Sequence, residues 1–146
     1  MATNTPLVLV AMSTTKQIAF LLARIILGVI LIAHGWDKFA ITGLEGVSGF
    51  FESLGIPAPG FAAPLAALIE ILGGVAIILG AFTRIAAAVI ALDMLFAALF
   101  AHISSGIFVS NNGWELTGAI GAGALLLIAA GAGKWSVDSL LPKRKA

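Results

Sequence analysis

The chain has 146 residues, of which 60% are hydrophobic and 10% charged, with a formal net charge of +1 and no cysteine. A soluble domain is about 25% charged and about 45–50% apolar, so this composition excludes a soluble globular domain and indicates an integral membrane protein. The lack of cysteine excludes disulfides, thiolate metal ligands and CxxC redox chemistry for this chain alone.

The chain before the first apolar stretch has no pattern of its own. Its apolar run, Leu7 to Met12, is too short for a signal peptide, and no positive residue precedes it. We therefore predict that residues 1–16 are disordered, and we leave open whether Met1 or Met12 is the true start. Residues 17–141 are predicted to form a single transmembrane domain, followed by a basic cytoplasmic tail at residues 142–146.

Four long apolar stretches predict an antiparallel four-helix transmembrane bundle, an all-α fold. A helix needs about 20 apolar residues to cross a bilayer core, whereas the dyad alternation of a membrane barrel is missing from these continuous runs. The predicted spans lie near Ile18–Trp36, Ala62–Gly80, Arg84–Ile103 and Gly113–Ala132.

The connections between these spans also carry signals. In the first, apolar residues at helical spacing, with Glu45 and Glu52 on the other side, predict a short amphipathic helix that ends at Gly55. The turn Gly80–Arg84 is tight enough to force an antiparallel pair, and Thr83 is predicted to cap the third span.

Basic residues near the spans predict the orientation. One side would hold Lys38 alone, and the other would hold Lys16, Arg84, Lys134, Lys143, Arg144 and Lys145. We therefore predict that both termini are cytoplasmic. The basic tail is interpreted as a headgroup anchor, and the patch is too small to predict nucleic-acid binding.

Ionisable side chains inside the spans are the main candidates for function, because a charge at bilayer depth costs at least about 2.5–3.5 kcal/mol. Counting 1.5 Å per residue from the cytoplasmic face puts Arg24 at about 9 Å, Asp93 at about 12 Å and Glu70 at about 18 Å. Arg24 and Asp93 are the best-matched pair by depth, and Glu70 is within reach of the guanidinium. We predict that these three groups converge inside the bundle.

A second layer is predicted near the outer face. His34, His102 and Glu115 all lie at about 24–27 Å, close to Lys38, and Trp114 is expected at the outer mouth. Asp93 and His102 are nine residues apart, on nearly opposite sides of an ideal helix, so either this helix distorts near its end or one of them faces elsewhere.

Each of these groups also has a structural interpretation. Arg24 and Asp93 would then be an ion pair that fixes helix register, and Glu115 would complement the dipole at a helix N-terminus. The histidines would be ordinary interfacial residues. His34, His102 and Glu115 together form a weak metal-ligand set, but no HxxE or HExxH spacing supports one, so no metal site is predicted.

A series of motifs covers almost everything from Arg24 to Leu141. They are R-x9-HG-x2-K, FF-x2-LG-IP-AP, E-x2-GG-x4-LG-x2-TR, ALDM, and GWEL followed by GAG-x-WSVD-x-LL. In this order they resemble the DoxX family of small four-helix bacterial inner-membrane proteins. The resemblance implies an inner-membrane location and a link to quinol oxidase or thiosulfate:quinone oxidoreductase complexes, or to redox-stress responses. The absence of cysteine argues against a thiol relay through this chain.

Three functions remain open from the sequence. The first is a membrane subunit that binds quinone or a related small redox molecule, or supports an oxidoreductase complex that does so; the cofactor is otherwise unknown. The second is a non-catalytic structural or assembly subunit, and the third a small proton-coupled transporter. The lipid bilayer is an expected partner, and redox-enzyme proteins and further copies of the chain are left open as partners. Whether the chain is an enzyme is also left open; if it is catalytic, the resemblance implies an oxidoreductase subunit that acts with a partner.

Overall fold

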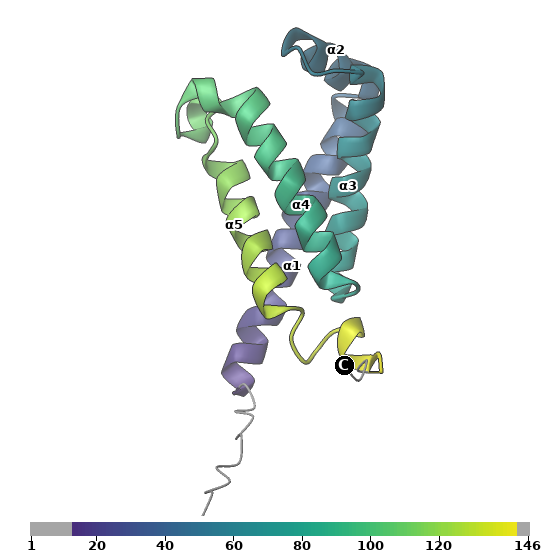
Figure 1. The fold of residues 1–146 in the computed structure, drawn as a ribbon, viewed down its shortest axis with the longest axis vertical. Coiled ribbons are helices and arrows are strands. Elements are labelled where there is room, and N and C mark those ends of the chain that lie inside the picture. Colours follow the sequence, from purple (N-terminus) through teal and green to yellow (C-terminus); the bar gives the residue numbers. More distant parts are fainter. Residues whose placement is uncertain (1–12, 143–146) are drawn as a thin grey trace, which may run out of the picture.

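The computed structural model describes residues 13–142, and the regular structure of this part is entirely helical (Figure 1). The segment 1–12 and the tail residues 143–146 lie outside the described residues, so the predictions made for them are not tested. Helix α1 begins at Thr14, so residues 14–16 of the segment that we predicted to be disordered are helical.

The predicted spans are confirmed, with bounds shifted by a few residues. They correspond to α1 (Thr14–Trp36), α3 (Pro59–Leu79), α4 (Thr83–Ala97) and α5 (Glu115–Ala130). Helix α4 continues through further helical turns to Ser105, and with it three of the spans are long and apolar enough to cross a membrane. The apolar α5 has 16 residues, about 24 Å, and is shorter than each of these three spans.

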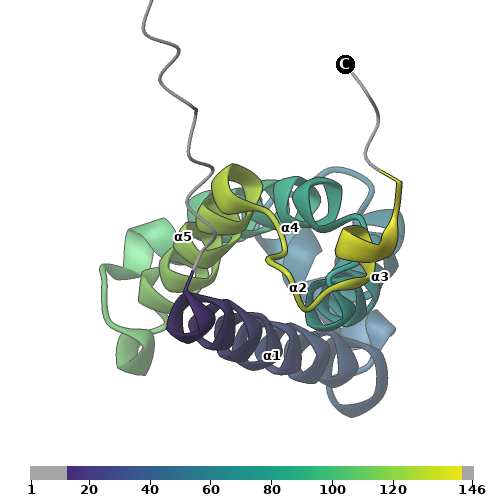
Figure 2. The ribbon, with the colours of Figure 1, turned by 90° about the horizontal axis from the view of Figure 1, so that it is seen from below.

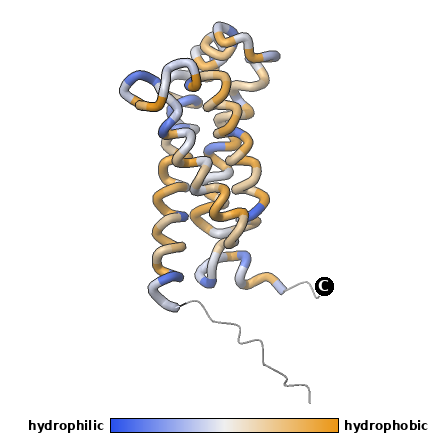
Figure 3. Tube along the Cα trace, turned by 60° about the vertical axis from the view of Figure 1, so that its left-hand side comes forward, coloured by the Kyte–Doolittle hydropathy of each residue, from blue (hydrophilic) through white to orange (hydrophobic). Residues whose placement is uncertain are grey.

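The outer surface of the bundle is apolar, as a lipid-facing surface requires. Ile26, Leu72, Ile85 and Leu126 are exposed by 60% to 69% although they are large hydrophobic residues. Hydrophobic residues run along the long helices, and hydrophilic ones gather mainly at the two ends (Figure 3). Water does not favour such a surface, so the structure is that of a membrane helical bundle.

The four helices pack as two pairs. Helix α1 lies on α3 and α4 lies on α5; the pairs meet through α3 and α4, whereas α1 and α5 touch little. Figure 2 shows the arrangement from below. Glycines allow the closest approach: a Cβ added to Gly28 would lie 2.6 Å from the carbonyl oxygen of Gly74, and one added to Gly74 would lie 2.7 Å from that of Gly28. Small residues at a shared face are how helices associate in lipid.

The predicted amphipathic helix is α2 (Leu44–Ser53), which packs on α3 and buries Val47. Gly55, with φ of 73°, follows its end, as predicted. Two π-helical turns extend the long helices at this end of the bundle, η1 (Asp37–Ile41) after α1 and η2 (Ala98–His102) after α4. Short 3-10 turns complete the chain at η3 (Ile103–Ser105), η4 (Val109–Asn111) and η5 (Val137–Leu140).

The hydrophobic core fills the bundle between the four long helices. Its buried members are Leu31, Ile77, Ala87, Ile90, Met94, Ile120, Ala124 and Leu127. The two ends of the described chain lie at the same end of the bundle, opposite α2 (Figure 1). This agrees with four crossings.

Candidate functional site

A cavity of about 780 Å³ lies between the helices, near the end that carries α2. Its wall is mostly apolar and comes from α1, α2, α3, α4 and α5. The ionisable residues that line it are His34, Asp37, Lys38, Glu70, Asp93 and His102. Six ionisable side chains that belong to three different helices or their π-helical extensions therefore face one space.

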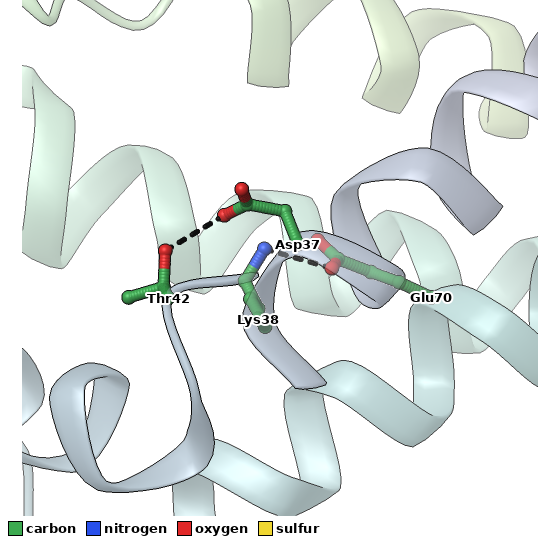
Figure 4. Close-up of polar contacts among 4 residues, drawn as sticks. All are labelled: Asp37, Lys38, Thr42 and Glu70. Atoms are coloured by element: carbon green, nitrogen blue, oxygen red, sulfur yellow. Dashed lines mark hydrogen bonds and ion pairs between the residues drawn. The ribbon is translucent and has the colours of Figure 1, made fainter. Parts of the chain in front are cut away.

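The pair formed by Lys38 and Glu70 is the main polar contact of this cavity (Figure 4). The Lys38 Nζ atom lies 2.7 Å from Glu70 Oε2 and 3.0 Å from Oε1, and donates to both. The Glu70 side chain is 5% exposed and that of Lys38 is 24% exposed. We expected Lys38 at the membrane interface and Arg24 beside Glu70; in the structure Lys38 is the partner of Glu70.

The π-helical turn η1 places Lys38 and its neighbour Asp37. A π turn takes in about one extra residue, so it rotates the residues that follow relative to an α-helix. Asp37 Oδ2 accepts a hydrogen bond of 3.0 Å from the Thr42 hydroxyl, which joins the two ends of the turn (Figure 4). Such turns are frequent at functional sites.

The second π-helical turn resolves the question of Asp93 and His102. An ideal helix would point them to nearly opposite sides, but η2 lies between them and both line the cavity. The His102 Nδ1 atom donates to the carbonyl oxygen of Asn112 at 2.8 Å. Of the two alternatives that the sequence left open, distortion of the helix is therefore correct.

Asp93 of α4 lines this cavity together with Glu70 of α3. It is partly buried, and among residues 13–142 its carboxylate takes part in no hydrogen bond or ion pair. The predicted Arg24–Asp93 ion pair is therefore absent from the described part of the chain. Instead, Asp93 and Glu70 share the cavity.

Arg24 lies apart from the cavity, at the opposite end of the core. Its side chain is 2% exposed, and its guanidinium donates to four backbone carbonyls. The acceptors are Ile77 at 3.0 Å, Ile78 at 2.8 Å, Trp135 at 3.0 Å and Ala132. The prediction that Arg24 joins Glu70 and Asp93 is wrong, because the last carbonyls of α3 and the segment after α5 satisfy this cation before any carboxylate does.

Asp138 performs the capping role that we assigned to Thr83. Its carboxylate accepts hydrogen bonds of 2.7 Å from the Phe82 N–H and 2.9 Å from the Thr83 N–H, at the start of α4. The Thr83 hydroxyl is buried without a partner among the described residues. Burial acts to raise the pKa of Asp138, but the hydrogen bonds from Thr83 and Phe82 together outweigh it and hold the pKa below its ordinary value.

The remaining candidates do not line the cavity. Glu115 Oε1 accepts a hydrogen bond of 2.7 Å from the Val109 N–H, so this carboxylate fixes the loop before α5. The Trp114 ring lies over Gly118, where an added Cβ would be 2.8 Å from it. Within residues 13–142 no group of three His, Asp or Glu side chains is placed to hold a metal ion, and the weak set of His34, His102 and Glu115 is not brought together.

Sequence reasoning missed two contacts, the Lys38–Glu70 ion pair and the capping of α4 by Asp138. Lys38 was named, but the register change at η1 that turns it toward Glu70 has no sequence signal. The capping role of Asp138 was missed because it comes from a segment 55 residues away from Thr83 along the chain. Its place in the WSVD motif was the available signal.

Comparison with known proteins agrees with this architecture. The DoxX family model matches residues 19–103, and the model described as "TQO small subunit DoxD" matches residues 62–146. "Inner membrane protein YqjF" of Escherichia coli is 35% identical over 133 residues, covering 91% of this chain and 99% of that protein. No solved structure gives a significant match.

Two further relatives are similar over different shares of the chain. "Inner membrane protein YphA" of Escherichia coli is 32% identical over 137 residues, which cover 84% of this chain and 90% of the relative. "Putative oxidoreductase CatD" of Bacillus subtilis is 40% identical over 88 residues, which cover 60% of this chain and 63% of the relative. With a family model over more than half of its length and a relative that it covers almost completely, the chain belongs to the DoxX family.

Proposed function

We propose that this protein is a membrane subunit that binds a quinone, or a related small redox molecule, in the cavity between α1, α3 and α4. The observation that carries this proposal is the cavity itself, with about 780 Å³ of mostly apolar space. Small-molecule sites are apolar clefts of about 300–1,000 Å³ with a few convergent polar groups. The polar groups here are the Lys38–Glu70 pair and Asp93.

The side chains match what a quinone needs. Reduction of a quinone takes up two electrons and two protons, and its carbonyl oxygens become hydroxyls. Lys38 would donate a hydrogen bond to one carbonyl oxygen, while Glu70 and Asp93 would hold and pass the protons. The electrons would come from a partner protein, because the sequence has no cysteine and no flavin or nucleotide motif.

The relatives support a redox setting. One matching model describes the small subunit of TQO, and one relative carries the name of an oxidoreductase. We extend these names to the present chain as part of the proposal, with a partner redox enzyme in a bacterial inner membrane. As part of the proposal, both termini are cytoplasmic and the cavity lies in the outer half of the membrane; the excess of basic residues near the end opposite α2 supports this orientation.

The two other functions have less support. A transporter would use discontinuous helices near its acidic residues, yet α3 is continuous through Glu70, Gly73 and Gly74. A purely structural role suits Arg24, whose partners are all backbone carbonyls. It gives no reason for the carboxylate of Asp93, which faces the cavity without a partner in the described chain.

Ligand-dependent stability in lipid nanodiscs tests the proposal. A ligand at 100 times its Kd stabilises the folded state by about 2.7 kcal/mol, which a melting experiment detects. We expect ubiquinone or menaquinone analogues to raise the Tm of the wild type, and to raise that of Glu70→Gln much less. Glu45→Gln is the matched control, because Glu45 is an exposed carboxylate on α2 that does not line the cavity. No shift in the wild type, or equal shifts in all three proteins, would exclude the site.

A further inference from the structure

A second hollow lies on another side of the bundle. Where α1 and α5 face each other they leave a groove of about 590 Å³. On α1 it is lined from Ala19 to Ile30, and on α5 from Leu116 to Ala130. None of the residues that line it is ionisable.

Small side chains create this space. Ala23 of α1 and Ala119 and Gly123 of α5 line the groove, and a Cβ added to Gly123 would meet the Leu27 side chain at 3.5 Å, an ordinary van der Waals distance. Two large residues of its lining, Ile26 and Leu126, are 60% and 69% exposed on the lipid-facing surface. The groove is therefore open to the bilayer from the side.

The groove continues the polar cavity along the axis of the bundle. Leu116 and Ile120 line both spaces. On α1 the cavity reaches down to Leu31 and the groove begins at the next residue, Ile30. From there it follows α1 to Ala19, which is about 16 Å at 1.5 Å per residue.

We propose that the groove between α1 and α5 holds the long apolar tail of the ligand whose polar head occupies the cavity. This rests on the proposed function and narrows it to a class, an amphiphile with a redox-active ring and an isoprenoid or similar hydrocarbon chain. The ring lies beside Lys38, Glu70 and Asp93, and the chain passes Leu116 and follows α1. Such a ligand enters from the bilayer through the side of the bundle, between α1 and α5.

Substitutions that fill the groove test this inference without touching the head cavity. Ala119→Leu places a larger side chain in the groove, and Gly123→Leu does so one turn further along α5. Ala122→Leu is the matched control, because this residue of the same helix is exposed and lines neither space. Two probes with one head group are compared in nanodiscs: ubiquinone-4, with four isoprene units, and ubiquinone-0, with none. Binding is followed by fluorescence of the three tryptophans.

We expect Ala119→Leu and Gly123→Leu to weaken the binding of ubiquinone-4 by about tenfold or more, as overpacking of an apolar site does. The binding of ubiquinone-0 should not change, and Ala122→Leu should leave both ligands as in the wild type. If ubiquinone-4 binds all four proteins equally, the tail site is refuted while the head site stands. The same follows if phospholipid that copurifies with the wild type fills the groove whether or not quinone is bound. If neither quinone binds the wild type, the proposed function itself fails.

Discussion

Arg24 offers the sharpest test of the structure, because the sequence and the structure assign it different partners. Replacing it by Met keeps the apolar stem and removes all four hydrogen bonds to backbone carbonyls. The bonds to Ile77 and Ala132 are buried, and a hydrogen bond to a charged group contributes about 1.5–3 kcal/mol. Counting only these two, we expect Arg24→Met to lower the free energy of unfolding by about 3–6 kcal/mol.

Two further variants make this result specific. Arg24→Lys keeps the charge but lacks the planar fork that serves carbonyls on both sides, so it should recover only part of the loss. Asp93→Asn should cost less than about 1 kcal/mol, and the double variant with Arg24→Met should be additive within about 0.5 kcal/mol. Reversible unfolding in mixed micelles gives these values. Trypsin gives a local readout, because Lys134 is exposed and release of the segment after α5 lets the chain around it unfold for cleavage.

A large coupling energy between Arg24 and Asp93 would refute this reasoning. It would mean that the two side chains form the ion pair that their similar depth suggested, and that the four backbone carbonyls do not hold Arg24 in the membrane. An Arg24→Met variant as stable as the wild type would refute it equally. In either case the segment after α5 would be anchored by other contacts.

Two more predictions concern the two ends of the bundle. At the cavity, Lys38→Met should destabilise the protein more than Glu70→Gln does, because it leaves the Glu70 carboxylate, which is 5% exposed, without its partner, whereas Glu70→Gln leaves the Lys38 ammonium, which is 24% exposed. In a double-mutant cycle followed by thermal unfolding, the double variant should be more stable, by about 1 kcal/mol or more, than the sum of the two single losses predicts. At the other end, Asp138→Ala should cost about 0.5–2 kcal/mol as a lost helix cap. Because the pKa of Asp138 is held below its ordinary value, its charge stabilises the fold above about pH 4, and this contribution is lost as the pH falls through the folded-state pKa. The wild type should therefore be more stable than Asp138→Asn by a constant amount from pH 5 to 8, and this difference should shrink in more acidic buffer.

The parts of the fold that follow from local pattern could be predicted. Continuous apolar runs of about 20 residues predict the spans, and apolar residues at helical spacing before Gly55 predict α2. Glycine also marks close helix contact, as at Gly74. These signals lie within a few residues of the features they predict, so a single sequence contains them.

The candidate site could be predicted only in part, because it depends on register. Counting 1.5 Å per residue predicted that Glu70 and Asp93 converge inside the bundle, and both do line one cavity. The same count gave Arg24 a carboxylate partner, because it weighs charges and ignores the unpaired carbonyls at a helix end. It also could not foresee the π-helical turn after α1 that brings Lys38 to Glu70, since one extra residue in a turn leaves the apolar pattern unchanged.

The division of the ionisable groups between the two ends is itself an argument about function. At the end near the chain termini, Arg24 and Asp138 are satisfied by backbone groups, and each holds a helix end in place. At the other end, Glu70 is paired from a π-helical turn and Asp93 faces a cavity without a partner in the described chain. A buried structural network is stable only when its members are satisfied, and the first set meets this condition. The second set costs free energy in the bilayer, so we infer that it is kept for the ligand proposed above.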